Sequence, residues 1–70
     1  MSSALNKTKL RSFLTELNEV LDKFGIKLNG EVEVFDKAVG DYVGFLEDEY
    51  SSLNIITEDG DTVVSVDKDV

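Results

Sequence analysis

Apolar residues recur with a helical period through the first third of the chain. From residue 6 to residue 24 they fall three or four positions apart, which places them on one side of a helix. The members of this stripe are Leu10, Phe13, Leu14, Leu17, Leu21 and Phe24, with Val20 beside them. Gly25 follows, where a left-handed residue often ends a helix, and Ile26 is then expected to pack back on Leu21. The pattern predicts an amphipathic helix over about residues 6–24.

The start of this predicted helix has an unusual charge distribution. Ser3 or Asn6 provides a capping side chain. Lys7, Lys9 and Arg11 lie in or near the first turn, where the helix dipole disfavours cations by roughly a few tenths of a kcal/mol each. Exposed charges cost little there. The alternative interpretation is a small basic patch for an acidic group, such as the acidic half of a second copy.

Beyond Gly25 the chain is rich in β-forming residues separated by turn residues, which predicts a sheet. The clearest unit is SLNIITEDGDTVVSV, residues 52–66, in which Asp59-Gly60 predicts a two-residue type I′ turn. The strand alternation agrees with that turn. The predicted pairs are Thr57 with Thr62, Ile55 with Val64 and Leu53 with Val66 on one face, and Ile56 with Val63 on the other.

In the segment GIKLNGEVEVF, residues 25–35, the turn signal and the alternation disagree. A tight Asn29-Gly30 turn would place two carboxylates on the aliphatic face, and burying them costs roughly several kcal/mol. Either one strand passes through Gly30, or a three-residue loop with a bulge forms, and the single strand is favoured. Both alternatives turn Ile26, Leu28, Val32 and Val34 inward and Lys27, Glu31 and Glu33 towards solvent.

Residues 36–52 fit two patterns. YVGFL, residues 42–46, is typical of a strand, whereas Phe35, Ala38, Val39, Tyr42 and Leu46 also match a helical period. Two glycines and several β-forming residues favour the strand. The predicted fold is therefore α+β, with one N-terminal amphipathic helix packed on a three- to four-stranded antiparallel sheet over about residues 26–67. Residues 1–70 are expected to form a single domain.

Composition narrows the range of functions. The chain has 70 residues, no Cys and no His, so the commonest general base and the commonest metal ligand are missing, and serine and threonine have no His or Cys to activate or replace them. No phosphate-binding loop motif occurs. No apolar run resembles a signal peptide or approaches a membrane span, so a cytoplasmic protein without membrane contact is expected. We expect neither enzymatic activity nor a cofactor.

Charge is divided unevenly along the chain. Residues 1–27 hold five bases and three acids, a net charge of +2, and residues 28–70 hold two bases and twelve acids, a net of −10. The total is −8. An acidic surface repels nucleic acid phosphates and attracts a basic protein surface. Carboxylates cluster at residues 47–49 and 58–61, but neither cluster has calcium-loop spacing, and solvated turns explain both.

Acids interleaved with one aromatic residue form the candidate partner-binding site. The candidate residues are Asp36, Asp41, Glu47, Asp48, Glu49 and Tyr50. Tyrosine is common at the energetic centres of interfaces, and carboxylates pair well with arginine. Such a surface can occupy a basic groove meant for nucleic acid. The alternative is a polar loop that keeps the sheet soluble.

The helix sequence LTELNEVLDKFG, residues 14–25, resembles that of small acidic proteins encoded by tailed bacteriophages. The resemblance implies a short amphipathic helix, a compact sheet and a location in the host cytoplasm. It also implies a role in host takeover or counter-defence, by binding and blocking a host protein. The resulting hypothesis is a non-enzymatic protein that binds and inhibits a basic partner.

The second hypothesis is a structural or self-assembling homo-oligomer with no inhibitory role. It would bury the remaining apolar residues Ile56, Val63 and one parity of residues 42–46. An uncovered edge strand offers a further route to pairing with a partner or a second copy.

Overall fold

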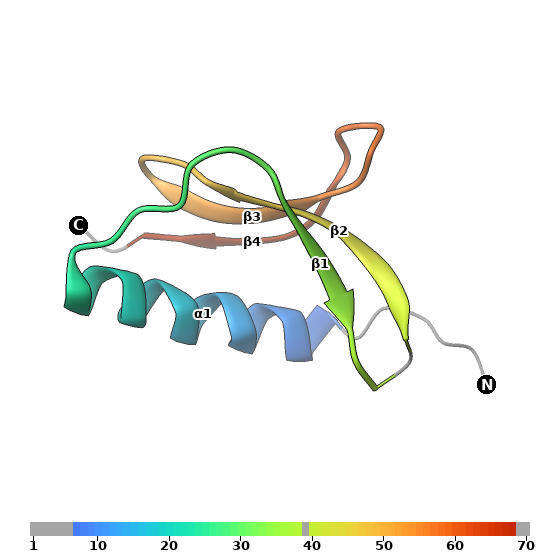
Figure 1. Cartoon of the computed structure of the whole chain (residues 1–70), viewed down its shortest axis with the longest axis horizontal. Helices are drawn as coiled ribbons and strands as arrows, with labels where there is room; N and C mark the ends of the chain where they lie inside the picture. The colour runs from blue at the N-terminus through green and yellow to red at the C-terminus, as the bar shows by residue number, and fades with distance from the viewer. Residues whose placement is uncertain (1–6, 39, 69–70) are drawn as a thin grey trace.

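The chain folds into a helix followed by a four-stranded antiparallel meander (Figure 1). A computed structural model describes residues 7–38 and 40–68. The elements are α1 (Lys7–Phe24), β1 (Val32–Asp36), β2 (Asp41–Asp48), β3 (Ser52–Ile56) and β4 (Thr62–Asp67). The strands lie in the order β1-β2-β3-β4, so β1 and β4 are the edges. The predicted α+β architecture is confirmed, and β2 confirms the strand interpretation of residues 42–46.

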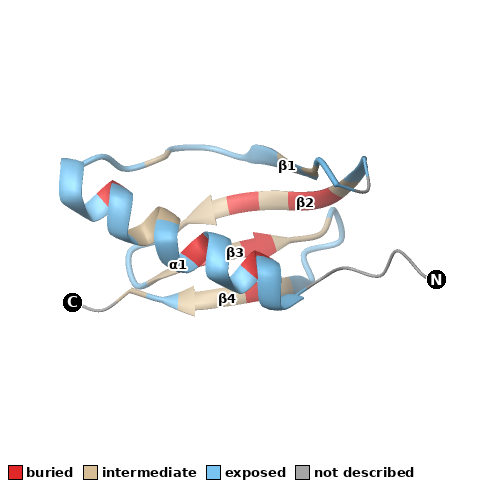
Figure 2. Cartoon of the chain, turned by 90° about the horizontal axis from the view of Figure 1, so that it is seen from below, coloured by how far each residue is buried: buried red, intermediate tan, exposed pale blue. Residues whose placement is uncertain are grey.

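The core forms between α1 and one face of the sheet. Its buried side chains are Leu10, Leu14 and Leu21 of α1 with Val43, Leu46, Leu53, Ile55 and Val64 of the sheet. The helix packs against β4 most extensively and then against β3 (Figure 2). The opposite face of the sheet carries no helix in the described part of the chain. That part also holds no helix long and apolar enough to cross a membrane.

The helix ends as its sequence predicts. Gly25 has a φ of 66°, and its N–H donates to the carbonyl of Asp22 at 3.3 Å. The N–H of Ile26 donates to the carbonyl of Leu21 at 2.9 Å, which completes the Schellman motif. The Ile26 side chain nevertheless remains 57% exposed, so its predicted inward orientation is wrong. The predicted capping residues, Ser3 and Asn6, lie outside the described residues.

Two basic residues near the start of α1 donate hydrogen bonds to the sheet. Lys9 Nζ donates to Asp36 Oδ1 at 2.8 Å, which joins α1 to the end of β1. Arg11 donates to the backbone carbonyl of Ser65 at 3.2 Å, which joins α1 to β4. These cations therefore orient the helix across the sheet.

The predicted strand through residues 26–35 is shorter than expected. β1 begins only at Val32, and neither the continuous strand nor the Asn29-Gly30 hairpin forms. The backbone N–H of Leu28 donates to the carboxylate of Asp48 at 2.8 Å instead of to a strand, and Gly30 turns the chain with a φ of 89°. The predicted division between faces is confirmed in part: Leu28 and Val34 pack against the core, and Glu31 and Glu33 are exposed. The predicted inward orientation of Val32 is wrong, because β1 is an edge strand that α1 does not cover and Val32 stays 41% exposed.

The turn between β3 and β4 has one residue more than predicted. Gly60 N–H donates to the Thr57 carbonyl at 3.0 Å, and Thr57 N–H donates to the Asp61 carbonyl at 2.8 Å. These bonds enclose residues 58–60, with Gly60 at a φ of 92°. The loop is the three-residue type, which needs one left-handed residue, whereas a type I′ turn needs two. The predicted pairing of Thr57 with Thr62 is therefore wrong.

A bulge in β4 restores the predicted register after this turn. Ile56 lies opposite Thr62, and the next pair is Ile55 with Val64, so Val63 is the extra residue. The predicted pairs Ile55–Val64 and Leu53–Val66 are confirmed. The predicted pair Ile56–Val63 does not form, because Val63 packs against the buried core.

A second bulge lies in the centre of β2. Val34 faces Gly44 and Phe35 faces Tyr42, so Val43 has no partner of its own. The extra residue lets Tyr42 share the helix-free face with Phe35 while Val43 enters the core. The helix-free face therefore collects more aromatic surface than strict alternation along β2 would give.

Candidate partner-binding surface

The six predicted binding residues lie at two ends of the sheet. Asp36 and Asp41 flank the β1–β2 turn, whereas the other four lie at and beyond the far end of β2. Seven residue steps separate Asp41 from Asp48 along β2, or roughly 23 Å at about 3.3 Å per residue. The structure does not bring these residues together as one surface.

Two of the five carboxylates among these residues are held inside the chain. The Asp36 side chain is 12% exposed and accepts hydrogen bonds from Lys9 and from the backbone N–H of Ala38 at 2.9 Å. The Asp48 side chain is 1% exposed. Asp41, Glu49 and Tyr50 are exposed, and Tyr50 reaches 87% exposure between β2 and β3. Asp36 and Asp48 therefore stabilise the fold through hydrogen bonds within the chain.

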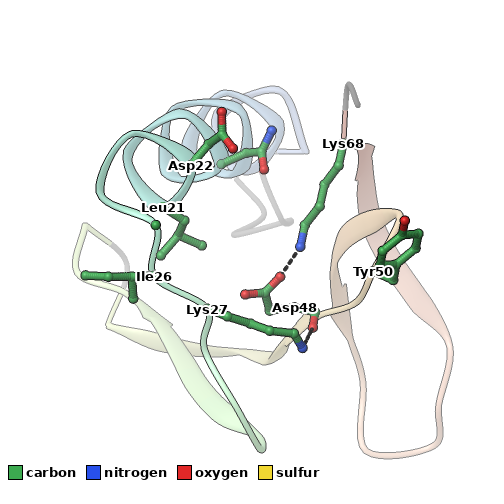
Figure 3. A pocket seen from close by; sticks show the side chains of 9 residues that line it. Leu21, Asp22, Ile26, Lys27, Asp48, Tyr50 and Lys68 are labelled. Carbon is green, nitrogen blue, oxygen red and sulfur yellow. Dashed lines mark hydrogen bonds and ion pairs between the residues drawn. The ribbon is translucent and has the colours of Figure 1, made fainter.

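Asp48 joins three separate segments (Figure 3). Its Oδ1 accepts from Lys68 Nζ and its Oδ2 from the Leu28 N–H, while Lys27 Nζ donates to its backbone carbonyl at 3.2 Å. Burial raises the pKa of Asp48, but the bonds from Lys68 and Leu28 outweigh it, so the pKa lies below its ordinary value. The ion pair of Asp48 and Lys68 borders a cavity of about 270 Å³ beside the last turns of α1. Both carboxylate oxygens already have partners.

The helix-free face of the sheet carries a row of aromatic rings. Tyr42 lies between Phe35 and Phe45, with ring centroids 5.7 Å apart in both pairs and interplanar angles of 65° and 77°. The Tyr42 hydroxyl is buried without a hydrogen-bond partner among the described residues. Burial is the largest cause that raises the pKa of this hydroxyl. The negative charges of Glu58, Glu33 and Glu31 raise it further.

Carboxylates surround this aromatic row. Glu33 lies opposite Phe45, and Glu47 lies opposite Asn54 on the same face. Burial raises the pKa of Glu47, and a hydrogen bond with Glu49 and the charges of Glu49 and Glu31 raise it further. We define the acidic aromatic face as Glu31, Glu33, Phe35, Tyr42, Phe45, Glu47, Glu49 and Glu58. Mutual repulsion among its acids is a cost that a cationic partner would remove.

Sequence reasoning found only part of this face. Glu47 and Glu49 were among the predicted residues, but the aromatic row was not, because Tyr42 and Phe45 are three positions apart. Strict alternation would place them on opposite faces, and only the bulge at Val43 brings them together. Gly44 within an apolar strand was the available signal, since an isolated strand glycine often marks a bulge.

Within residues 7–38 and 40–68, no three acidic side chains are arranged so that they could hold a metal ion. The sequence matches no family model and no curated protein, and no solved structure matches the fold. Fold and surface together define a class: a small two-layer α+β protein with an acidic aromatic sheet face.

Replacing Glu47 by glutamine tests the repulsion on this face. A raised pKa in the folded state stabilises the protein below the unfolded value, about 4.3, and this contribution is lost as pH rises through the folded value. Glu47→Gln is therefore expected to unfold at higher urea concentration than the wild type at pH 7. At pH 3.5 to 4 the two proteins should have similar midpoints. A midpoint at pH 7 at or below that of the wild type would contradict the expected repulsion.

Proposed function

We propose that the chain is a non-enzymatic interaction protein that binds and inhibits a protein with a basic surface. The observation that carries the proposal is the acidic aromatic face, where five carboxylates surround three packed rings on the side of the sheet without a helix. The resemblance to phage proteins makes a host protein the expected target, in host takeover or counter-defence.

The chemistry of this face fits arginine and lysine side chains. A guanidinium group pairs with carboxylates through directed hydrogen bonds and stacks on aromatic rings. Phe35 is 58% exposed, so part of its ring is available for such a contact. The unpaired Tyr42 hydroxyl supports a role beyond stability, since such groups are rare in native structures and cost about 1–3 kcal/mol each.

Charge reversal on the face tests the proposal. Glu33→Lys, Glu47→Lys and Glu58→Lys together should weaken capture of basic proteins from a bacterial lysate about a hundredfold or more, because attraction becomes repulsion. The wild type should release its bound proteins between 0.1 M and 1 M salt, where the Debye length falls from about 10 Å to about 3 Å. Immobilised protein and quantitative elution provide the measurement.

The helix offers a matched control. Glu16, Glu19 and Asp22 are exposed on α1, away from the face, and reversing all three to Lys changes the net charge by the same amount. This control should keep most of its capture. Equal losses in the two triple variants would show that net charge alone attracts basic proteins, and salt-independent capture would also refute the proposal.

A further inference from the structure

One flank of α1 leaves large apolar side chains uncovered. Phe13, Val20 and Phe24 are 43%, 50% and 65% exposed. Their spacing of seven and four residues places them on one side of the helix, next to the buried stripe of Leu10, Leu14 and Leu21. The hydrophobic surface of α1 is therefore wider than the surface that the core uses.

The sheet is uncovered on the side that this flank faces. A helix is about 10 Å wide and strands are about 4.8 Å apart, so one helix covers about two strands. Because α1 packs on β4 and β3, β1 is left open, and its Val32 is 41% exposed. A cavity of about 210 Å³ separates α1 from β1, with Phe13 and Val34 among its lining residues.

These side chains together define the α1–β1 groove: Phe13, Val20, Phe24, Val32 and Val34. We propose that a second copy of the chain covers this groove, so that two α1 helices pack on each other about a two-fold axis. Each helix then covers the open half of the other sheet.

The charge distribution favours a second copy in this position. The described helix carries four bases and three acids, a net charge of +1, whereas residues 28–70 have a net of −10. Contact through α1 therefore joins the two chains at their least acidic side. It leaves the two acidic aromatic faces pointing outward, on the sides of the sheets that α1 does not cover.

Size favours association as well. Within residues 7–38 and 40–68, eight buried hydrophobic side chains make a small core, and domains of this length often depend on oligomerisation for stability. A standard interface buries about 800 Å² on each partner around an apolar centre, and the groove residues supply such a centre.

The proposed contact differs from the one expected from the sequence, since Val63 packs in the core and Ile56 lies on the helix-free face. The dimer would present two partner-binding faces, which raises avidity for a repeated target.

Sedimentation across a dilution series tests the dimer. The wild type is expected to reach twice 7.8 kDa and to dissociate on dilution. Val20→Glu combined with Phe24→Glu should raise the dissociation constant at least a hundredfold without loss of helical circular dichroism, because both side chains are exposed in the monomer. Tyr50→Glu, an equally polar change at an exposed aromatic residue outside the groove, should leave it unchanged. A wild type that stays monomeric at millimolar concentration, or a dimer that survives both groove substitutions, overturns the proposal.

Cross-linking identifies which surfaces meet. The chain lacks Cys, so a single Val20→Cys substitution places one thiol near the proposed axis, and a short bis-maleimide should then link two chains. Tyr50→Cys should give little linked product. A dimer in which Val20→Cys fails to cross-link would indicate pairing through a sheet edge and would refute the groove contact.

Salt distinguishes dimer formation from binding of a basic partner. We expect 1 M salt to leave the dimer intact or strengthen it, whereas the same salt should release a basic partner.

Discussion

Gly44→Val is expected to remove a large part of the domain's stability at 25 °C. A Cβ atom at Gly44 would lie 2.4 Å from the backbone oxygen of Ile56 and 3.1 Å from Ile55 Cγ2, on the neighbouring strand. Real side chains do not approach a backbone oxygen so closely, so β2 and β3 would have to separate at the centre of the sheet. Overpacking costs about 1–3 kcal/mol and sometimes more, against a total stability of about 4–10 kcal/mol for 70 residues.

The smaller substitution Gly44→Ala makes the effect measurable. It should lower the free energy of unfolding in urea by about 3 kcal/mol, since the Cβ alone produces the clash. Gly40→Ala is the matched control: a Cβ there meets nothing within 4 Å, and only its φ of 70° opposes a side chain, at about 1–2 kcal/mol. Similar costs at the two glycines would show that the close approach of β2 to β3 does not constrain Gly44.

Local patterns predicted the elements better than the irregularities between them. The stripe from Leu10 to Phe24 and the glycine after it predicted both the helix and its Schellman end, because both depend on residues close in sequence. Two facing pairs of β3 and β4, Ile55–Val64 and Leu53–Val66, were also predicted correctly, since one buried face fixes a register strongly. The two compensating irregularities, a three-residue turn and the bulge at Val63, could not be inferred, because together they leave the alternation almost unchanged.

The candidate site was harder to predict because its geometry depends on contacts distant in sequence. Glu47, Asp48 and Glu49 form one acidic run, which suggested a solvated loop. β2 continues through Asp48, however, and turns the Asp48 side chain inward. The neighbouring side chains of Glu47 and Glu49 face outward. Its partners Leu28 and Lys68 both lie 20 residues away, in opposite directions along the chain. No local pattern distinguishes such a carboxylate from the acids beside it.

Asp48→Ala is expected to destabilise the fold by about 3–5 kcal/mol, the usual cost of removing one partner from a buried ion pair. The substitution leaves the Lys68 ammonium, whose side chain is only 19% exposed, without its counterion. It also removes the acceptor of the Leu28 N–H and so releases the segment that carries the chain from α1 to β1. Asp41→Asn, at the exposed start of the same strand, should change stability by less than about 0.5 kcal/mol. Urea unfolding of both variants gives the comparison.

The pH dependence distinguishes the ion pair from simple packing at Asp48. Although burial raises the pKa of this carboxyl, the bonds from Lys68 and Leu28 hold it below the unfolded value of about 3.9. The stability from its charge is therefore fully present above the unfolded pKa and is lost as pH falls through the lower folded value. The gap between wild type and Asp48→Ala should then be constant from pH 5 to 7 and shrink steadily below about pH 4. A gap that persists unchanged into acid would mean that Asp48 stabilises the fold through its volume, and the Lys68 pair would contribute little.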